Sequence, residues 1–294
     1  MIDWMKYRFL YFGISALVVG AGVFSLIRWG LVFGIDFKGG TLLEYKVTRD
    51  ISEKALSNKI SKQEITVSSI QKTGDKTYLL KLGPIDQNQK AEVEKILTEE
   101  LGTKPDELRF ETVGPTIGPE LVKKTIFALS ISSITILLWV AYQFRSIKFG
   151  ASAILAMFHD TLVVIGMYSI FGHFWHVEAD FLFVTALLTI LSFSVHDTIV
   201  VYDRMRESQK KFGGNLYDLA NQATTETMVR SLNNSFTILF MLIALMILGG
   251  STIRWFAATL FVGTVSGTYS SPFVAVPILV TWDEIEKKLK RRLT

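Results

Sequence analysis

The chain has 294 residues, of which 49% are hydrophobic, and its mean hydropathy is +0.34. The apolar residues are gathered in long runs, which indicates a membrane protein. Cysteine is absent, so disulfides and thiolate metal sites are excluded. The formal net charge of +4 is concentrated at the ends of the apolar runs, which is typical of a membrane topology signal and not of a nucleic-acid surface.

Six membrane spans are predicted, because six apolar runs reach the roughly 20 residues that cross a bilayer. They cover residues 9–29, 124–144, 150–171, 181–202, 228–249 and 256–280. The first run is too long for the core of a signal peptide, so we expect it to remain as a span. Lysine and arginine gather in alternate short loops, which predicts that both termini are cytoplasmic. The expected fold class is a polytopic α-helical membrane protein.

The spans divide the chain into four predicted segments. The first is a cytoplasmic N-terminus with the first membrane helix, the second an extracytoplasmic domain, the third the remaining membrane helices, and the fourth a basic cytoplasmic tail. These segments are residues 1–29, 30–123, 124–282 and 283–294.

The extracytoplasmic segment is predicted to be a small α+β domain. Its alternating and helical apolar patterns predict strands and helices in the order βαββαβ, which is that of a ferredoxin-like domain. The strands are expected at 41–48, 65–72, 76–82 and 108–113, and the helices at 52–62 and 87–101. Asp50 and Glu53 resemble a helix-start box for the first of these helices.

Two of the predicted spans contain a His-Asp pair, His159-Asp160 and His196-Asp197. A carboxylate at membrane depth costs roughly 2.5–3.5 kcal/mol on insertion scales, so an ion or proton path is the default hypothesis. Asp197 lies about 9 Å above the end of its span, at 1.5 Å per residue, and we expect it to pair with Arg230. A static ion pair between two helices is the alternative. His159, Asp160 and His196 either extend a proton relay or form a polar clasp between spans three and four.

Two further patterns concern helix packing. Polar residues at helical spacing in the fifth span should face protein, because lipid offers no hydrogen-bond partners; they are Arg230, Asn233, Asn234 and Thr237. In the sixth span, Gly263 and Gly267 form a small-xxx-small pair that permits close helix packing. Pro272 and Pro277 are expected to bend or loosen the end of that span.

No enzymatic activity, metal or cofactor is predicted, and the coupling ion is expected to be the proton. Nucleotide-binding and nucleophile-elbow motifs are missing. Tyr202-Asp203 lacks the second motif of an intramembrane aspartyl protease. A metal at an outer loop remains an alternative to an interfacial loop anchored by aromatic residues; the candidate ligands are His173, His176, Glu178 and Asp180.

Four signatures in chain order resemble the SecD/SecF family of the bacterial Sec export machinery, and more specifically its SecF branch. The first runs from Asp36 through Gly39 and Gly40 to Thr41, and the second is Val113-Gly114-Pro115-x-x-Gly118. The third runs from Asp197 through Asp203 and Arg204 to Glu207, and the fourth is Gly267-Thr268-Tyr269-Ser270-Ser271. The resemblance covers essentially the whole chain, Gly263 included.

This resemblance implies one half of a resistance–nodulation–division-type transporter in the bacterial inner membrane. It implies pairing with SecD in a twelve-span unit, association with the SecYEG channel and with YajC, and action on a translocating preprotein driven by the proton motive force. Asp197 and Arg230 match the acid and the arginine of the family's proton pathway, although the family usually has asparagine where this chain has His196. The alternatives are a small-molecule exporter subunit of the same superfamily and a non-conducting scaffold of the translocon.

Overall fold

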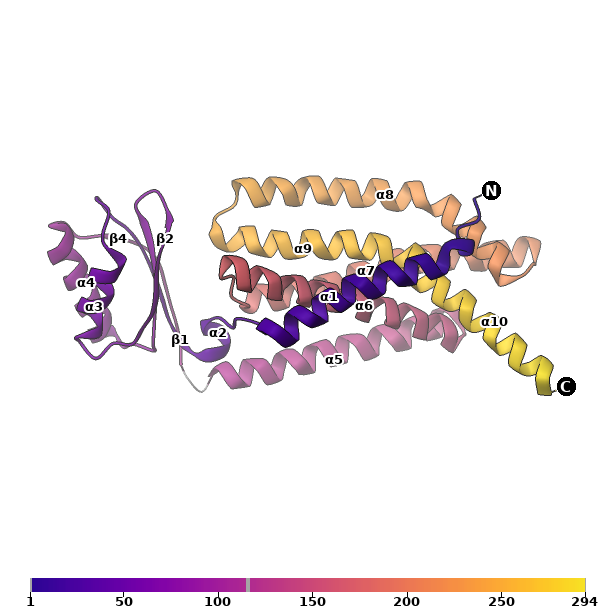
Figure 1. Ribbon diagram of the computed structural model, residues 1–294, viewed down its shortest axis with the longest axis horizontal. Helices are drawn as coiled ribbons and strands as arrows, with labels where there is room; N and C mark the ends of the chain where they lie inside the picture. Colours follow the sequence, from indigo (N-terminus) through magenta and orange to yellow (C-terminus); the bar gives the residue numbers. More distant parts are fainter. Residues whose placement is uncertain (1, 115–116, 294) are drawn as a thin grey trace. The chain divides into compact units, whose positions relative to one another are not determined.

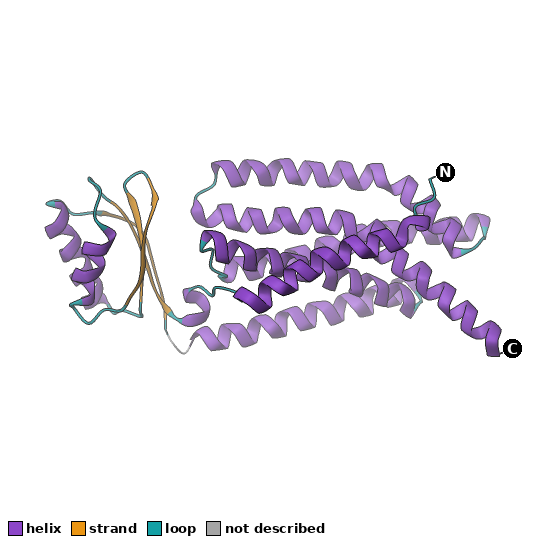
Figure 2. Cartoon of the chain, viewed as in Figure 1, coloured by secondary structure: helices purple, strands orange, loops and turns teal. Residues whose placement is uncertain are grey.

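The computed structural model describes residues 2–114 and 117–293. The chain forms two compact units, one of residues Phe33–Ile126 and the other of Met1–Val32 together with Phe127–Thr294. The first contains the sheet and the second is helical (Figures 1 and 2).

The smaller unit is a four-stranded sheet with helices α3 and α4 on one face (Figure 2). Its strand order is β2-β3-β1-β4, and each neighbouring pair is antiparallel. The elements are α2 (Ile35–Lys38), β1 (Gly40–Lys46), α3 (Glu53–Ser61), β2 (Val67–Gly74), β3 (Thr77–Leu82), α4 (Gln87–Leu101) and β4 (Asp106–Val113). The predicted order βαββαβ is confirmed, with the short helix α2 added before β1.

Local sequence explains where helix α4 begins and ends. The Asp86 side chain accepts a hydrogen bond from the Gln89 backbone, and the Gln89 side chain accepts one from the Asp86 backbone, which completes a capping box. Gly102 follows the helix with φ of 74°, a left-handed conformation that glycine adopts without steric penalty. The apolar face of α4 (Val93, Ile96, Leu97 and Leu101) is buried against the sheet.

The start predicted for α3 is wrong in its detail. Ser52 precedes the helix and makes no side-chain capping bond. Asp50 binds the side chains of Lys72 (2.6 Å) and Tyr78 (3.2 Å) instead. The Asp50 carboxylate therefore forms an ion pair with Lys72 of β2 and does not cap the helix as the local pattern predicted.

The larger unit is a bundle of long helices. Its elements are η1 (Met5–Tyr7), α1 (Arg8–Trp29), α5 (Ile117–Phe144, from Phe127 on), α6 (Ile147–Trp175), α7 (Phe181–Phe212), α8 (Leu216–Leu248), α9 (Ser251–Ser270), η2 (Ser271–Ala275) and α10 (Val276–Leu293). Five segments are long and apolar enough to cross a membrane: Met5–Trp29, Gly118–Phe144, Ile147–Trp175, Phe181–Phe212 and Leu216–Leu248. Helix α9 is not one of these five, so the sixth span stays a prediction.

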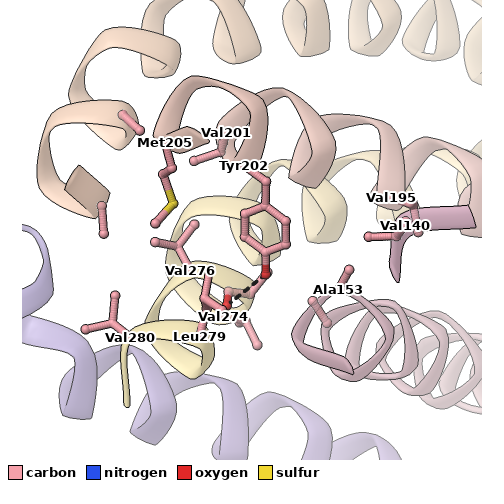
Figure 3. Close-up of a cluster of buried hydrophobic side chains, with 14 of the residues drawn as sticks. Val140, Ala153, Val195, Val201, Tyr202, Met205, Val274, Val276, Leu279 and Val280 are labelled. Atoms are coloured by element: carbon pink, nitrogen blue, oxygen red, sulfur yellow. Dashed lines mark hydrogen bonds between the residues drawn. The ribbon is translucent and has the colours of Figure 1, made fainter. Parts of the chain in front are cut away.

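Helices α7 and α9 form the centre of the bundle, since α9 packs against α6, α7 and α8, and α7 packs against the same two outer helices. A buried cluster surrounds Tyr202 of α7, whose hydroxyl donates to the Ala275 carbonyl at 3.2 Å, the dashed line in Figure 3. The same hydroxyl lies 2.6 Å from Ser152 Oγ of α6. Tyr202 therefore ties α6 and α7 to the segment that follows α9.

That segment, η2, is a π-helix containing Pro272. Proline has no N–H group and its ring clashes with the carbonyl four residues earlier, so a regular α-helix cannot continue through it. A π-turn is one way to absorb such a break. The disturbance expected at Pro272 is therefore a local change of helix type between α9 and α10.

Helices α1 and α6 approach each other closely at two glycines that the sequence analysis did not single out. A Cβ atom placed on Gly166 would lie 2.3 Å from the Gly22 Cα. One turn along, Ser25 donates to Ser169 at 2.8 Å, and Ser169 donates to the Gly30 carbonyl at 2.6 Å. Small residues thus set the distance between these helices, as in other membrane bundles.

Candidate functional site

Asp160 is the centre of a polar network inside the helical bundle. Only 1% of the residue is exposed. Its Oδ2 accepts hydrogen bonds from Ser194 and Ser270, and its Oδ1 accepts one from Ser266, each at 2.6 Å. The donors come from α7 and α9, so one carboxyl group of α6 joins three helices.

His159 extends this network towards a cavity. Its Nδ1 lies 3.1 Å from Asp160 Oδ1, and its Nε2 is buried without a hydrogen-bond partner. The cavity has a volume of about 350 Å³ and lies between α1, α6 and α9, with Tyr269 and Ser266 in its lining. His159 and Ser266 are therefore the members of the network that border this cavity.

Asp197 lies one helical turn after Ser194 on α7, and 4% of the residue is exposed. In contrast to Asp160, its buried Oδ2 has no hydrogen-bond partner within the described part of the chain. The following residue, Thr198, contacts Ser271 of η2 at 3.0 Å. Ser194, which binds Asp160 of α6, and Asp197 thus lie on adjacent turns of α7. Both oxygens of the Asp160 carboxyl group accept hydrogen bonds, whereas Oδ2 of Asp197 accepts none from the described residues.

The expected direct pair between Asp197 and Arg230 is not formed among the described residues. The arginine side chain is exposed, and among the described residues no hydrogen bond or ion pair joins it to the carboxyl group. The reason lies in how α8 packs: its buried side carries the small residues Ser231 and Ser235, and Ser235 contacts Thr268 of α9 at 2.6 Å.

The polar strip on α8 consequently faces outwards. Arg230, Asn233, Asn234 and Thr237 are all exposed, whereas we expected them to face protein. His196 is exposed as well, so the structure does not bring it to Asp160. Within this chain the predicted proton-pathway residues therefore divide into two buried carboxyl groups (Asp160 and Asp197), the partly buried His159 beside Asp160, and an exposed pair (His196 and Arg230).

The glycines of the first two family signatures meet where α2 lies beside the start of α5. Gly39 and Gly40 have φ of 77° and 144°, and a Cβ on Gly40 would lie 2.9 Å from the Leu82 carbonyl oxygen. A Cβ on Gly118 would lie 2.3 Å from the Phe37 carbonyl oxygen. Only glycine fits these approaches. Asp36 stands in the first turn of α2 and Gly114 directly after β4, while Pro115 lies outside the described residues.

The signatures in α7 and α9 have distinct positions. Near the C-terminal end of α7, Asp203 accepts a hydrogen bond from Arg206 at 2.8 Å, and Arg204 pairs with Glu207 of α7 and Glu226 of α8. On α9 the small residues lie against α7: Gly263 packs on Ile190, and a Cβ on Gly267 would lie 3.3 Å from the Ser194 Cα. Ser270 reaches Asp160, and Tyr269 donates to the Tyr11 carbonyl of α1 at 3.0 Å.

Three serine contacts of the site were not predicted. Ser194 and Ser266 donate to Asp160, and Ser271 contacts Thr198. A signal was present, because Ser266 and Ser270 are four residues apart on the face that carries Gly263 and Gly267. Serine at helical spacing beside a glycine pair marks a close, polar helix contact.

Two of the four candidate ligands in the predicted outer loop, Asp180 and His173, have structural roles. Asp180 caps α7 by accepting a hydrogen bond from the Phe183 backbone at 2.8 Å. The His173 ring stacks on Trp29 with ring centroids 4.2 Å apart. Across the described parts of the chain, no group of three or more histidine or acidic residues is arranged to hold a metal ion.

Comparison with known proteins identifies the family. Residues 92–285 match the family described as "Protein export membrane protein SecD/SecF, C-terminal", and residues 24–51 match the "SecD/SecF GG Motif". The protein translocase subunit SecF of Thermobaculum terrenum is 38% identical, with 96% of this chain and 94% of that protein covered. SecF of Anaerolinea thermophila is 37% identical, with 97% and 96% covered.

A longer relative contains the same region as part of a fused chain. The translocase subunit SecDF of Thermus thermophilus is 35% identical over 95% of this chain and 39% of that protein. The crystal structure of Thermus SecDF, a translocon-associated membrane protein, matches with a TM-score of 0.83 and 32% identity, over 96% of this chain and 39% of that one. The super-membrane-facing form of SecDF matches with a TM-score of 0.73. The chain therefore belongs to the SecD/SecF family of protein export membrane proteins.

Proposed function

We propose that this chain works with SecD and uses the proton motive force to promote late steps of protein export across the bacterial cytoplasmic membrane. Its role as an accessory subunit of the protein translocase follows from its family. The observation that carries the proton-driven mechanism is Asp197, a buried carboxyl group whose Oδ2 accepts no hydrogen bond from the residues that the structure describes. Ionisable groups inside membrane spans are rare and mark ion or proton paths.

In this proposal Asp197 takes up and releases the coupled proton, and Arg230 is the cation whose distance from it changes. The arrangement in this structure, with Arg230 exposed and apart from the carboxyl group, is one of the two arrangements that the proposal requires. His159, Asp160 and His196 extend the path. One charge that crosses 100 mV yields about 2.3 kcal/mol, enough to bias two conformations. The bias requires that these conformations bind the proton with different affinity.

The proposed partners are SecD, the SecYEG channel, YajC and the translocating preprotein. The Thermus SecDF chain supports SecD, because the region similar to this chain is 39% of a single longer polypeptide there. Proton transfer through side chains needs no cofactor, so we propose none. It breaks no covalent bond of the preprotein, so we propose no enzymatic activity. We also propose that both termini lie in the cytoplasm, which is supported by the charge distribution of the short loops.

Two features of the fold belong to the same proposal. We assign a sixth span to α9, η2 and the start of α10, which is supported by the packing of α9 against three of the candidate spans. We assign the 33–126 unit to the ferredoxin-like class, which is supported by its antiparallel order β2-β3-β1-β4 and by two helices on one face.

The test is the substitution Asp197→Asn in the complex with SecD and SecYEG, reconstituted in vesicles with an imposed proton gradient. We expect proton uptake and the gradient-dependent fraction of preprotein export to be lost, while the export that does not depend on the gradient persists. Asp218→Asn is the matched control, since Asp218 is an exposed carboxylate at the start of α8. If Asp197→Asn assembles with SecD and keeps full gradient-dependent export, the chain is a scaffold and not a proton-driven subunit.

A further inference from the structure

Helix α10 changes character along its length. Its first part is held in the bundle, where Val276, Leu279 and Val280 are at most 1% exposed. Beyond that point the helix extends away from the neighbouring helices towards the C-terminus (Figure 1). Its apolar side chains there are uncovered: Trp282 is 39% exposed, Ile285 52% and Leu289 55%.

These three side chains form one stripe, because residues three and four apart share a helix face. The stripe is continuous with the buried start of α10. A contiguous apolar stripe on an otherwise charged helix needs a cover other than water.

The acidic residues of α10 fix its orientation relative to the bundle. Glu284 pairs with Arg8 of α1 through two hydrogen bonds of 2.7 and 2.8 Å. Asp283 accepts a hydrogen bond from Lys148 of α6 at 3.1 Å, and Glu286 pairs with the same lysine. The anionic side of α10 is thus held by α1 and α6.

The basic residues of α10 are exposed beyond these ion pairs. They are Lys287, Lys288, Lys290 and Arg291. Lys287 and Lys290 bridge to Asp283 and Glu286 one turn earlier, at 2.6 and 2.7 Å, and still leave most of their side chains exposed. An exposed cationic cluster therefore accompanies the apolar stripe. The carboxylates of α10 pair with Arg8 and Lys148 of the bundle as well as with Lys287 and Lys290 of the cluster.

We propose that the segment of α10 from Trp282 to Arg291 lies in the surface of the bilayer and binds anionic phospholipid head groups. A helix with an apolar stripe and a basic polar face inserts its stripe at the boundary of head groups and acyl chains. Its lysine and arginine side chains place their aliphatic stems on the apolar surface and their charges in the head-group layer. Clusters of basic residues directly after a membrane helix gain affinity from anionic lipid.

The chain has no cysteine, so a single spin label can be introduced by Leu289→Cys in the full-length protein. The protein is reconstituted in phosphatidylcholine vesicles with and without phosphatidylglycerol. The measurement is the ratio of label collisions with oxygen and with a water-soluble nickel chelate. We expect phosphatidylglycerol to raise this ratio, since the label then enters the apolar boundary. Screening by high salt should reverse the change.

Charge removal on α10 provides the decisive comparison. Lys288→Gln with Arg291→Gln should reduce the partition of α10 into the anionic surface, roughly five-fold for each cation. Lys210→Gln with Lys211→Gln removes the same charge from the end of α7 and should leave the ratio unchanged.

Each contrary outcome overturns the proposal. One is a ratio that does not respond to phosphatidylglycerol, and another is an equal loss in the α7 control. A third is a label that responds to a polynucleotide but not to lipid, which would identify a nucleic-acid surface. If the α10 charge variant does not assemble, the salt dependence of the parent protein decides the question in the same way.

Discussion

Asp160→Ala tests whether the polar network of Asp160 holds α6, α7 and α9 together. The substitution removes the common acceptor of three serine hydroxyls, each at 2.6 Å from the carboxyl group. A buried hydroxyl that loses its partner costs about 1–3 kcal/mol. Ser270 also lies 3.3 Å from the Gly267 carbonyl, and a helical serine can turn to such a backbone acceptor. We therefore take the lower value for each serine and expect a loss of about 3 kcal/mol.

The same reasoning predicts a rescue. Replacing both partners of a buried hydrogen bond by apolar groups is nearly neutral, so Asp160→Ala combined with alanine at Ser194, Ser266 and Ser270 should regain most of the lost stability. The assay is reversible unfolding of the purified protein in mixed micelles with increasing denaturing detergent. Asp218→Ala serves as the exposed-carboxylate control.

Two results would refute this reasoning. If Asp160→Ala costs no more stability than Asp218→Ala, the carboxyl group does not hold the three helices together. If the combined variant is less stable than Asp160→Ala alone, the serines stabilise the bundle through contacts other than Asp160.

Three further predictions follow from the packing and the charges. Gly166→Ala should destabilise the helical unit, because its Cβ would lie 2.3 Å from the backbone of α1, whereas Gly13→Ala meets nothing within 4 Å; detergent unfolding compares the two. Gly118→Ala should lower the melting temperature of the sheet-bearing unit, because the new Cβ would lie 2.3 Å from a backbone oxygen. Gly13→Ala should leave the melting temperature as it is in the parent protein. Hydrogen bonds from two lysines lower the pKa of Glu286 from 4.5 to about 2. The stabilisation from these pairs is therefore complete above about pH 4.5 and disappears as the pH falls towards 2. The mobility of α10 should increase over this pH range in the parent protein, and Glu286→Gln should abolish the contribution of these pairs to that increase.

Much of the fold follows from local pattern. Long apolar runs located five helices that are long and apolar enough to cross a membrane, and alternation with turn residues located the strands of the small unit. Boundaries were less accurate where polar residues continue a helix. Helix α8 begins at Leu216, twelve residues before the apolar run that predicted it, because Asn215 caps it by accepting a hydrogen bond from the Asp218 backbone.

The candidate site was only partly predictable, for a physical reason. Asp160 and Asp197 stand out because a carboxyl group in an apolar run is rare. Their environments depend on contacts between residues far apart in the chain, such as Ser266 with Asp160. A serine in a membrane helix carries no local sign of its partner. The prediction for Arg230 was wrong for a different reason. Its charge suggested a partner inside the bundle, but the small residues of α8 occupy the buried side of the helix.

The two His-Asp pairs look alike in the sequence and have opposite surroundings in the structure. Asp160 has donors from α7 and α9 and the His159 ring beside it, so its burial is compensated. Asp197 is nearly as buried, but its Oδ2 has no partner. A buried carboxyl group without a donor is unfavourable unless it gains a proton or a cation. The neighbouring strip of exposed polar residues on α8 is likewise unfavourable against lipid. A second polypeptide seated on the polar strip of α8 would remove the second of these deficits, and a proton taken up by Asp197, as we propose, would remove the first.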